Sequence, residues 1–315
     1  MAVNWTNPYE NACDFKFKGS LHTHTPNPAS RCGSVPIGEL AGIYKRMGLS
    51  FMAVTNHNYL TDLAGESSPG FCVLPGIEID IATKRHFGVV HADASKIHYD
   101  PKASQQELID RNVSAGALVT LHHPDWQLRE HYTIDELLSL NGYDGIEIYN
   151  SIVERLDGSP LSTAKWDRLL ASGRRVLGFA NQDFHELCDA SFCCNAAACA
   201  DNSASSIFAA LKAGRFYCHN GVSILKLGRN GDVVRVATAN AKLIRFVGPG
   251  GVVLKKVKGV SAEFEFLPDS PANFYVRVEC LGEGEEISFS QPFFRCAAAE
   301  PVESVNSLTL RLASL

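Results

Sequence analysis

The stretch GSLHTHT, residues 19–25, places two histidines, His22 and His24, two positions apart near the start of the chain. Small polar neighbours surround them where an ordinary strand would carry a hydrophobic alternation. In an extended strand, residues two positions apart project from the same face, so both imidazoles point to one place and can bind one metal ion together. An isolated H-x-H pair also occurs among ordinary surface and core histidines, so its interpretation depends on the rest of the chain.

The composition is that of an ordinary globular protein. Its 315 residues are enough for two domains, and its hydrophobic and charged contents of 45% and 20% are typical. The formal net charge is -5 and no block of Lys or Arg is present, so we expect no nucleic-acid partner.

The N-terminal region and the cysteines indicate in which cellular compartment we expect the protein. Residues 1–19 lack a basic start followed by an apolar core, and no stretch approaches the roughly 18 apolar residues of a membrane helix. We therefore expect a cytoplasmic protein with no membrane partner, whose ten cysteines are reduced thiols. The group Cys188, Cys193, Cys194 and Cys199 is dense enough for a separate zinc site, but its spacing fits no common zinc pattern, and packing as small apolar residues is the alternative.

Strands and helices are expected to alternate over residues 15–220. The expected strands are the opening one before His22 and then 49–54, 72–80, 86–90, 117–121, 145–149 and 175–180. The expected helices are 37–48, 103–116, 133–142, 162–173 and 203–214, several of them ending in glycine. Seven strands with intervening helices predict a parallel β/α barrel, with a doubly wound sheet as the alternative.

The pattern changes at about residue 221. Short strands follow one another between Gly, Pro, Asn and Asp residues, at 223–228, 233–239, 242–248, 251–257, 262–267, 273–280, 286–290 and 307–312. This pattern predicts a small all-β domain, most simply a sandwich. We therefore expect a barrel domain over 1–220 and an accessory β-domain over 221–315, and since the latter contains no histidine, we expect it to be dispensable for chemistry.

Potential metal ligands gather at the ends of the expected strands. They are His22 and His24, His57, Glu78, His86 and His91, His122 and His123, and Asp183 and His185. In a parallel barrel all strand C-termini open onto one face, where such enzymes hold their active sites. Imidazole and carboxylate are ligands that transition metals prefer, so this distribution predicts a metal cluster.

Five motifs, HTHT, VTNHN, GIEID, HHP and QDFH, occur in this order between residues 15 and 220. With them the chain resembles the polymerase and histidinol phosphatase (PHP) family of metal-dependent phosphoesterases. The resemblance implies a distorted seven-stranded β/α barrel with up to three manganese, iron or zinc ions. The trailing β-domain resembles the one in a two-domain branch of that family, which also includes hydrolases of non-phosphate esters and carbamates.

The resemblance also implies a distribution of ligands. The first metal would take His22, His24, Glu78 and Asp183; the second would take His57 and His185; the third would take His123, the bridging Glu78, and His86 or His91. Because the last two point to opposite faces of a strand, at most one can serve, and the family pattern favours His86. His122 would lie on the opposite strand face, in packing. Glu78 and Asp183 would be the catalytic carboxylates.

Two positions depart from the family pattern. Asn56 stands where an Asp is frequent, so a hydrogen-bond acceptor that could orient a ligand remains while the charge is lost. Cys32, with Arg31 beside it, occupies the loop in which the family usually has Asp. Either Cys32 is a thiolate ligand of the second metal, or it is an ordinary loop residue and that metal is weakly held or absent.

The expected activity is hydrolysis of a small phosphomonoester or phosphodiester by water activated on two to three divalent ions (Mn, Fe or Zn). Arg31 would clamp a phosphate oxygen or be a solvated loop residue, and Asn150 would bind substrate. The alternative is a carbamate, ester or amide hydrolase with the same cluster, for which aromatic walls and no phosphate-clamping arginine are expected. A third possibility is a binding or regulatory module without turnover, motivated by Cys32 and Asn56.

Overall fold

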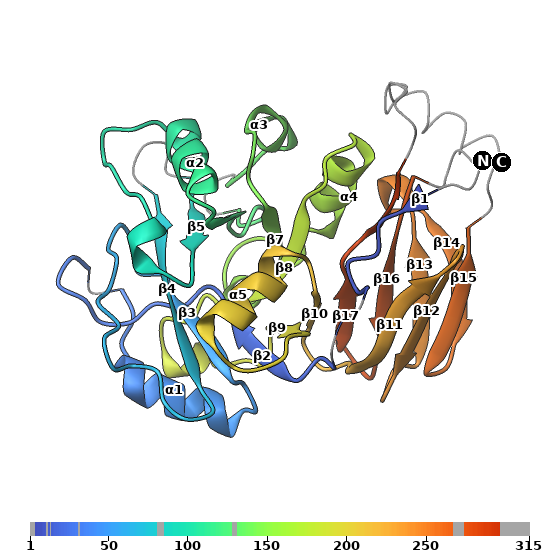
Figure 1. The fold of residues 1–315 in the computed structure, drawn as a ribbon, viewed down its shortest axis with the longest axis horizontal. Coiled ribbons are helices and arrows are strands. Elements are labelled where there is room, and N and C mark those ends of the chain that lie inside the picture. Colours follow the sequence, from blue (N-terminus) through green and yellow to red (C-terminus); the bar gives the residue numbers. More distant parts are fainter. Residues whose placement is uncertain are drawn as a thin grey trace.

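The computed structural model describes residues 4–10, 12, 14–30, 32–80, 85–127, 131–266 and 274–296. Arg31 and the strand expected at 307–312 lie outside the described residues. Figure 1 shows an α/β part that contains the five α-helices and, beside it, a part made of strands. Among the described residues, no helix has the length and apolar character needed to span a membrane.

The seven expected strands of the α/β part all form, and they lie side by side in chain order. They are β2 (Phe17–Ser20), β3 (Phe51–Val54), β4 (Cys72–Ile79), β5 (Phe87–Val90), β6 (Leu118–Leu121), β7 (Gly145–Asn150) and β8 (Leu177–Asn181). Their mixed α/β character is as predicted. A closed seven-stranded barrel remains a proposal.

Strand β5 corrects the expectation of an all-parallel arrangement, because it is antiparallel to both β4 and β6. Only the short segment 80–86 joins β4 to β5, and a parallel crossover needs a dozen or more residues. The beginning of β5 therefore lies beside the C-terminal ends of β4 and β6. Its end lies at the opposite edge of the sheet.

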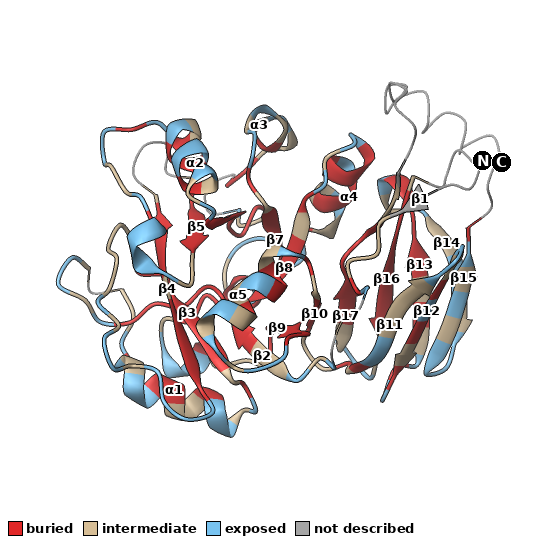
Figure 2. Cartoon of the chain, viewed as in Figure 1, coloured by how far each residue is buried: buried red, intermediate tan, exposed pale blue. Residues whose placement is uncertain are grey.

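The five expected helices also form, each inside its predicted range. They are α1 (Ile37–Arg46), α2 (Gln105–Ser114), α3 (Ile134–Ser139), α4 (Thr163–Ala171) and α5 (Ala204–Lys212). Capping boxes begin α2, through Ser104 and Glu107, and α3, through Thr133 and Glu136. The helices carry exposed residues on one side and buried ones on the other, while the central strands are buried (Figure 2).

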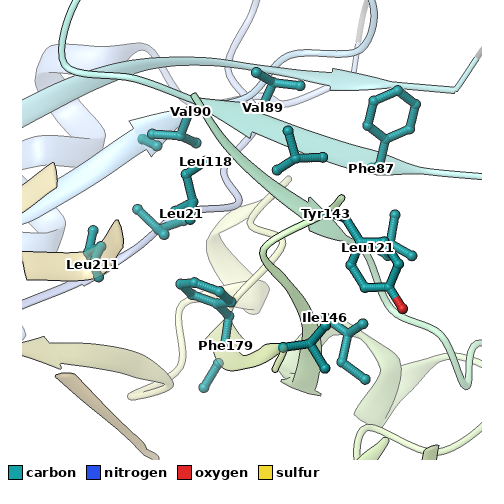
Figure 3. Packing of buried hydrophobic residues seen from close by; sticks show 14 of the residues in the cluster. Leu21, Phe87, Val89, Val90, Leu118, Leu121, Tyr143, Ile146, Phe179 and Leu211 are labelled. Carbon is teal, nitrogen blue, oxygen red and sulfur yellow. The ribbon is translucent and has the colours of Figure 1, made fainter. Parts of the chain in front are cut away.

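The core of the α/β part lies between the strands and the helices. Side chains such as Leu21, Val89, Leu118, Ile146 and Phe179 meet there (Figure 3). Cys193, Cys194 and Cys199 are buried apolar residues, Cys188 is exposed, and none of the described groups of potential metal ligands includes any of the four. The packing alternative for these cysteines therefore describes their setting better than a zinc site.

Two strands that the sequence analysis did not predict connect the two parts. Strand β9 (Cys194–Ala197) pairs antiparallel with β2 and with β10 (Phe216–His219). Strand β10 also pairs antiparallel with β17 (Ile287–Ser290), so the sheet continues from one part into the other. The division into domains at residue 220 stays a prediction, and it falls one residue after this shared strand.

The strands after residue 220, together with the N-terminal β1, form two layers that share one core. One layer holds β11 (Ile224–Asn230), β12 (Val233–Thr238) and β15 (Ser261–Glu265). The other holds β17 with β13 (Leu243–Val247), β14 (Val253–Lys258), β16 (Tyr275–Leu281), β18 (Phe293–Cys296) and the short β1 (Asn4–Trp5). Their inner side chains, among them Val234, Phe246 and Val278, pack together as in the expected sandwich.

Candidate metal centre

Glu78, the penultimate residue of β4, lies at the middle of the histidine cluster. Its Oε1 is 2.8 Å from His122 Nδ1 and 3.1 Å from His22 Nε2, and its Oε2 is 3.0 Å from His57 Nδ1. Three further imidazoles lie 3.3–3.5 Å away, those of His86, His24 and His123. Burial raises the pKa of the Glu78 carboxyl, but the surrounding imidazoles, His22 first, hold it well below its ordinary value.

Backbone pairing beyond the strands explains why these side chains converge. His57 follows β3, whose extension pairs on one side with β4, where the Glu78 N–H donates to the Asn56 carbonyl at 3.2 Å, and on the other side with the HTHT segment, where the Thr55 N–H donates to the Thr23 carbonyl at 2.9 Å. On the opposite side of this segment, the His24 N–H donates to the Phe184 carbonyl at 2.8 Å, which joins the ends of β2 and β8. The polar HTHT segment is therefore held between the extensions of two neighbouring strands.

Asp183 follows β8 and forms the second carboxylate of the centre. Its Oδ1 is 3.1 Å from His22 Nε2 and 3.2 Å from His24 Nε2. Burial raises the pKa of this carboxyl, but His22 and His24 lower it well below its ordinary value. Asp183 and His123 have positive φ angles of 54° and 28°, a backbone conformation that is strained for such residues and frequent at functional sites.

The donor atoms form overlapping groups, each within 4.8 Å. These groups are His22, His24 and Asp183; His22, Glu78, His122 and His123; His57, Glu78 and His86; His86, His123 and His131; and His24, Cys32, His57 and His185.

Buried polar atoms without a hydrogen bond indicate whether metal ions fit this centre. Buried nitrogen and oxygen atoms that could bind a metal and make no hydrogen bond include His24 Nδ1, His57 Nδ1, Glu78 Oε2, His86 Nδ1, His123 Nδ1 and Asp183 Oδ1. Each buried polar atom without a partner costs about 1–3 kcal/mol, so this concentration is unfavourable in the protein alone. Imidazole and carboxylate donors suit manganese, iron and zinc, so the residues present fit a group of divalent ions.

Glu147 on β7 is a buried carboxylate that the sequence analysis missed. Its Oε1 accepts hydrogen bonds from Asn181 Nδ2 at 2.9 Å and lies 2.8 Å from His22 Nδ1, while its Oε2 accepts from the His123 N–H at 2.7 Å. Burial raises its pKa, but His122 and His22 lower it to about 2. Such a partner fixes the orientation of a ligating imidazole. The sequence signal was the glutamate inside the apolar strand GIEIY, which parallels GIEID around Glu78.

The structure separates the two alternatives for the third metal. His86 precedes β5, and its Nδ1 lies 3.3 Å from Glu78 Oε1. His91 follows β5, and its Nδ1 accepts a hydrogen bond from the Asp93 N–H at 2.8 Å, away from the centre. The antiparallel direction of β5 causes this difference. It brings His86 to the cluster and takes His91 to the other edge of the sheet.

Three predicted positions have different surroundings from those expected. His122, expected to lie in packing, bonds Glu78 through Nδ1 and stacks on His22 with ring centroids 3.8 Å apart. Asn56 orients no imidazole, because its Oδ1 accepts from the Thr25 N–H at 2.8 Å. Asn150, the predicted substrate ligand, is buried and donates to Glu147 Oε2 at 2.8 Å and to Asp183 Oδ2 at 3.4 Å.

Two more residues of the centre were not predicted. Asp80 directly follows β4, and its Oδ2 lies 3.4 Å from His57 Nδ1. His131 is buried, and its Nε2 accepts a hydrogen bond from the His86 N–H at 3.1 Å. Asp80 belongs to the quoted GIEID motif, which was a usable signal. His131 follows no expected strand, so its sequence position gave none.

Cys32, half-buried, lies in the group of His24, His57 and His185. Burial raises the pKa of its thiol, but hydrogen bonds and charge from His185 and His57 outweigh this effect and lower it to about 7. Burial lowers the pKa of both imidazoles. Glu78 and Asp80 nevertheless raise that of His57 to about 11, and Cys32 and Asp183 raise that of His185 to about 9.

A pocket opens onto the centre. Its polar lining residues are His57, Glu78, His86, His123, Asp183 and His185. Its apolar lining residues, called the apolar wall below, are Trp126, Ile152, Val153 and Leu156. Three of these four belong to or follow the 3₁₀ helix η2 (Ser151–Arg155), directly after β7. No lysine or arginine lines this pocket within the described part of the chain.

No protein-family model and no curated protein matches the sequence. Solved structures that resemble this one include the following three. A two-domain protein from Bacteroides vulgatus, described as containing a predicted PHP-like metal-dependent phosphoesterase, is 12% identical, with a TM-score of 0.48 over 95% of this chain and 90% of that one. A protein from Bifidobacterium adolescentis, whose description as a metal-dependent phosphoesterase is provisional, is 14% identical. Its TM-score is 0.40 over 53% of this chain and 87% of that one. An amidohydrolase from Chromobacterium violaceum, with bound sulfate and no metal, is 15% identical, with a TM-score of 0.37 over 53% and 87%.

Proposed function

We propose that this chain is a metal-dependent hydrolase of the PHP type that cleaves a small phosphomonoester or phosphodiester. The observation that supports this proposal is the convergence of Glu78 and Asp183 with imidazoles from the ends of several strands. Many of the buried nitrogen and oxygen atoms of these side chains make no hydrogen bond. An ordinary core would leave few such atoms unpaired. The five motifs in family order support the same activity.

In this proposal three neighbouring positions hold divalent ions. His22, His24, Glu78 and Asp183 hold the first; His57 and His185 the second; Glu78, His86 and His123 the third. When bound, such ions polarise the ester and acidify a water to hydroxide near neutral pH. Glu147 keeps His22 in the orientation required for binding, because it accepts from Nδ1 and leaves Nε2 directed at Glu78 and Asp183.

Glu78 and Asp183 are the proposed catalytic carboxylates, because both line the pocket as well as the cluster. Asn150 donates to Asp183 Oδ2, and we therefore assign it to positioning this carboxylate in addition to any contact with substrate. The apolar wall formed by Trp126, Ile152, Val153 and Leu156 limits the access of water to the pocket.

The direct test is a hydrolysis screen of phosphoesters, carbamates and lactones with the metal-loaded protein. We expect turnover of at least one phosphoester that is abolished by chelation and by His22→Ala. The matched control is His91→Ala, since His91 lies outside the cluster, and this variant should retain turnover. Metal binding without turnover of any substrate would favour the non-catalytic module instead.

A second candidate function is hydrolysis of a carbamate, ester or amide with the same cluster. The apolar wall with Trp126, and the absence of lysine and arginine from the described pocket lining, favour a substrate without a phosphate group. Arg31, the predicted phosphate clamp, lies outside the described residues. If this candidate is correct, a neutral aryl ester or carbamate will be turned over faster than its phosphate analogue, and Trp126→Ala will remove that preference.

A further inference from the structure

Cys32 is close to the metal centre although it lies far from Glu78 in the sequence. One donor atom each of Cys32, His24, His57 and His185 lies within 4.8 Å of the others. The three imidazoles form a stack, with the His24 ring centroid 4.5 Å from that of His57 and 4.2 Å from that of His185. The thiol therefore faces a set of nitrogen donors that come from the ends of β2, β3 and β8.

The loop that carries Cys32 is fixed against two of these histidines. The Ser34 N–H donates to the His185 carbonyl at 2.8 Å. Gly33 has a φ of +84°, and a Cβ at this position would lie 2.5 Å from the backbone of His24 and of Thr25. Only glycine permits this close approach. The position of the thiol beside the imidazoles is thus built into the backbone.

The histidines of this group have unused capacity for a ligand. His24 is fully buried, and its Nε2 lies 3.2 Å from Asp183 Oδ1 and 3.4 Å from Glu78 Oε2, so it belongs to the neighbouring first position. His57 Nδ1 makes no hydrogen bond, and His185 Nδ1 donates to the Asp183 carbonyl at 2.7 Å, which leaves the Nε2 of His185 for a ligand. His57 and His185, with Cys32, then remain as the donors of the second position.

We infer that Cys32 is a thiolate ligand which, with His57 and His185, holds one ion of the centre and makes that position selective for zinc-class ions. This inference rests on the proposed function and extends it to the choice of metal. Two imidazoles and one thiolate leave one coordination position open, as in catalytic zinc sites. A thiolate favours zinc over manganese, which prefers oxygen donors. The other two positions, with Glu78 and Asp183, keep carboxylate ligands.

The test uses metal-free protein titrated with Co²⁺ as a spectroscopic probe for zinc. We expect a thiolate-to-cobalt charge-transfer band in the wild-type protein and in Cys188→Ser, whose side chain is exposed and outside the group. The band should be lost in Cys32→Ser and Cys32→Ala. In both variants the Zn²⁺ affinity of one site should fall at least about 10-fold, the lower limit even for removal of a partner that only orients a ligand.

An alkylation experiment on the wild-type protein avoids any effect of substitution on folding. Bound Zn²⁺ should protect Cys32 from iodoacetamide, while Cys188 reacts at the same rate with and without metal and serves as the internal reference.

Cys32→Asp should shift the metal preference of the second position from Zn²⁺ towards Mn²⁺.

The outcomes separate this inference from the proposed function. Binding of Co²⁺ without the charge-transfer band, or equal alkylation of Cys32 in both states, overturns the thiolate ligand and leaves the metal-dependent hydrolase intact. Failure of the wild-type protein to bind Co²⁺, Zn²⁺ or Mn²⁺ overturns both.

Discussion

At the scale of single residues, Glu78 connects the largest part of the cluster. Its Oε1 lies 3.1 Å from Nε2 of His22, a proposed ligand of the first position, and 3.3 Å from Nδ1 of His86, a proposed ligand of the third. A carboxylate in this position can bridge two ions. We therefore expect Glu78→Ala to lose more than one ion per chain, measured by elemental analysis of the purified protein.

The control for this prediction is Glu263→Ala, which removes an exposed glutamate of β15 and should leave the metal content unchanged. Circular dichroism establishes that both variants are folded. An unaltered metal content in folded Glu78→Ala would contradict the bridging assignment.

The protonation of the histidines predicts how metal affinity depends on pH. Carboxylates and Cys32 raise the pKa of His57 to about 11 and that of His185 to about 9 against the effect of burial, so both are protonated at neutral pH in the metal-free protein. A metal binds the neutral imidazole and must displace these protons. Affinity should therefore rise with pH up to about 9 for His185, and further towards about 11 for His57.

Calorimetric titrations in two buffers with different ionisation enthalpies measure the protons released on Zn²⁺ binding. We expect net release at neutral pH and a smaller release in His185→Asn. An affinity that stays constant between neutral pH and the pKa of about 9 would show that these imidazoles are not ligands.

At the scale of elements, strand β5 determines the geometry around His122. A Cβ at Gly88 would lie 2.3 Å from His122 Nε2, while His122 Nδ1 bonds Glu78. Because the His122 ring also stacks on His22, an added methyl group must displace His122 and disturb its contact with Glu78. We expect Gly88→Ala to lower metal affinity at least about 10-fold and stability by about 1–3 kcal/mol.

Metal titration and urea unfolding of Gly88→Ala measure these two effects. The matched control is Gly38→Ala on α1, where a Cβ meets nothing within 4 Å and alanine should be neutral or slightly stabilising. Wild-type metal affinity in Gly88→Ala would show that the position of His122 does not determine that of Glu78.

The elements show what the sequence could and could not predict. Strands β2 to β8 and the helices α1 to α5 were predictable, since periodicity and caps are local properties. The direction of β5 was not, because it depends on which strand ends the short segment 80–86 joins. The same limit applies to His122 and Glu147, whose buried partners come from other strands. Strands β9, with the sequence CNAA, and β10, with FYCH, contain no Val, Ile or Leu, unlike the equally short β3, β5 and β6, so no apolar run marked them as strands.

At the scale of the whole molecule, the β-domain is joined to the α/β part by more than a linker. Strand β10 has partners in both, β9 and β17. The sequence analysis expected the β-domain to be dispensable for chemistry, and no ligand of the described centre comes from it. Removal of residues 221–315 would nevertheless expose one edge of β10. We therefore expect truncation to unfold the α/β part, and the activity to be lost with the fold.

A buried ion pair forms the strongest polar link between the two parts. Arg277 of β16 is 2% exposed and donates through Nε and Nη2 to the two oxygens of Asp167 on α4, at 2.8 Å and 2.7 Å. Its Nη1 donates to Glu279 at 2.7 Å, and the Tyr275 hydroxyl donates to Asp167 at 2.9 Å. The guanidinium also lies 5.2 Å from the centroid of the Trp166 ring.

Asp167→Ala removes the bidentate partner and leaves the buried guanidinium with Glu279 alone. We expect a loss of about 3–5 kcal/mol in the free energy of unfolding, because the charge keeps its desolvation cost and loses most of its compensation. Urea unfolding checks this value against Asp100→Ala, which breaks the exposed Arg111–Asp100 pair and should cost about 0–1 kcal/mol. Replacing both partners, Asp167→Leu with Arg277→Met, should recover part of the loss, since the buried guanidinium is gone and Glu279 keeps Arg245, whose Nη2 lies 2.8 Å from it, while the Tyr275 hydroxyl loses its acceptor. Equal losses for Asp167→Ala and Asp100→Ala would mean that the two parts are held together by the β10–β17 pairing and apolar packing alone.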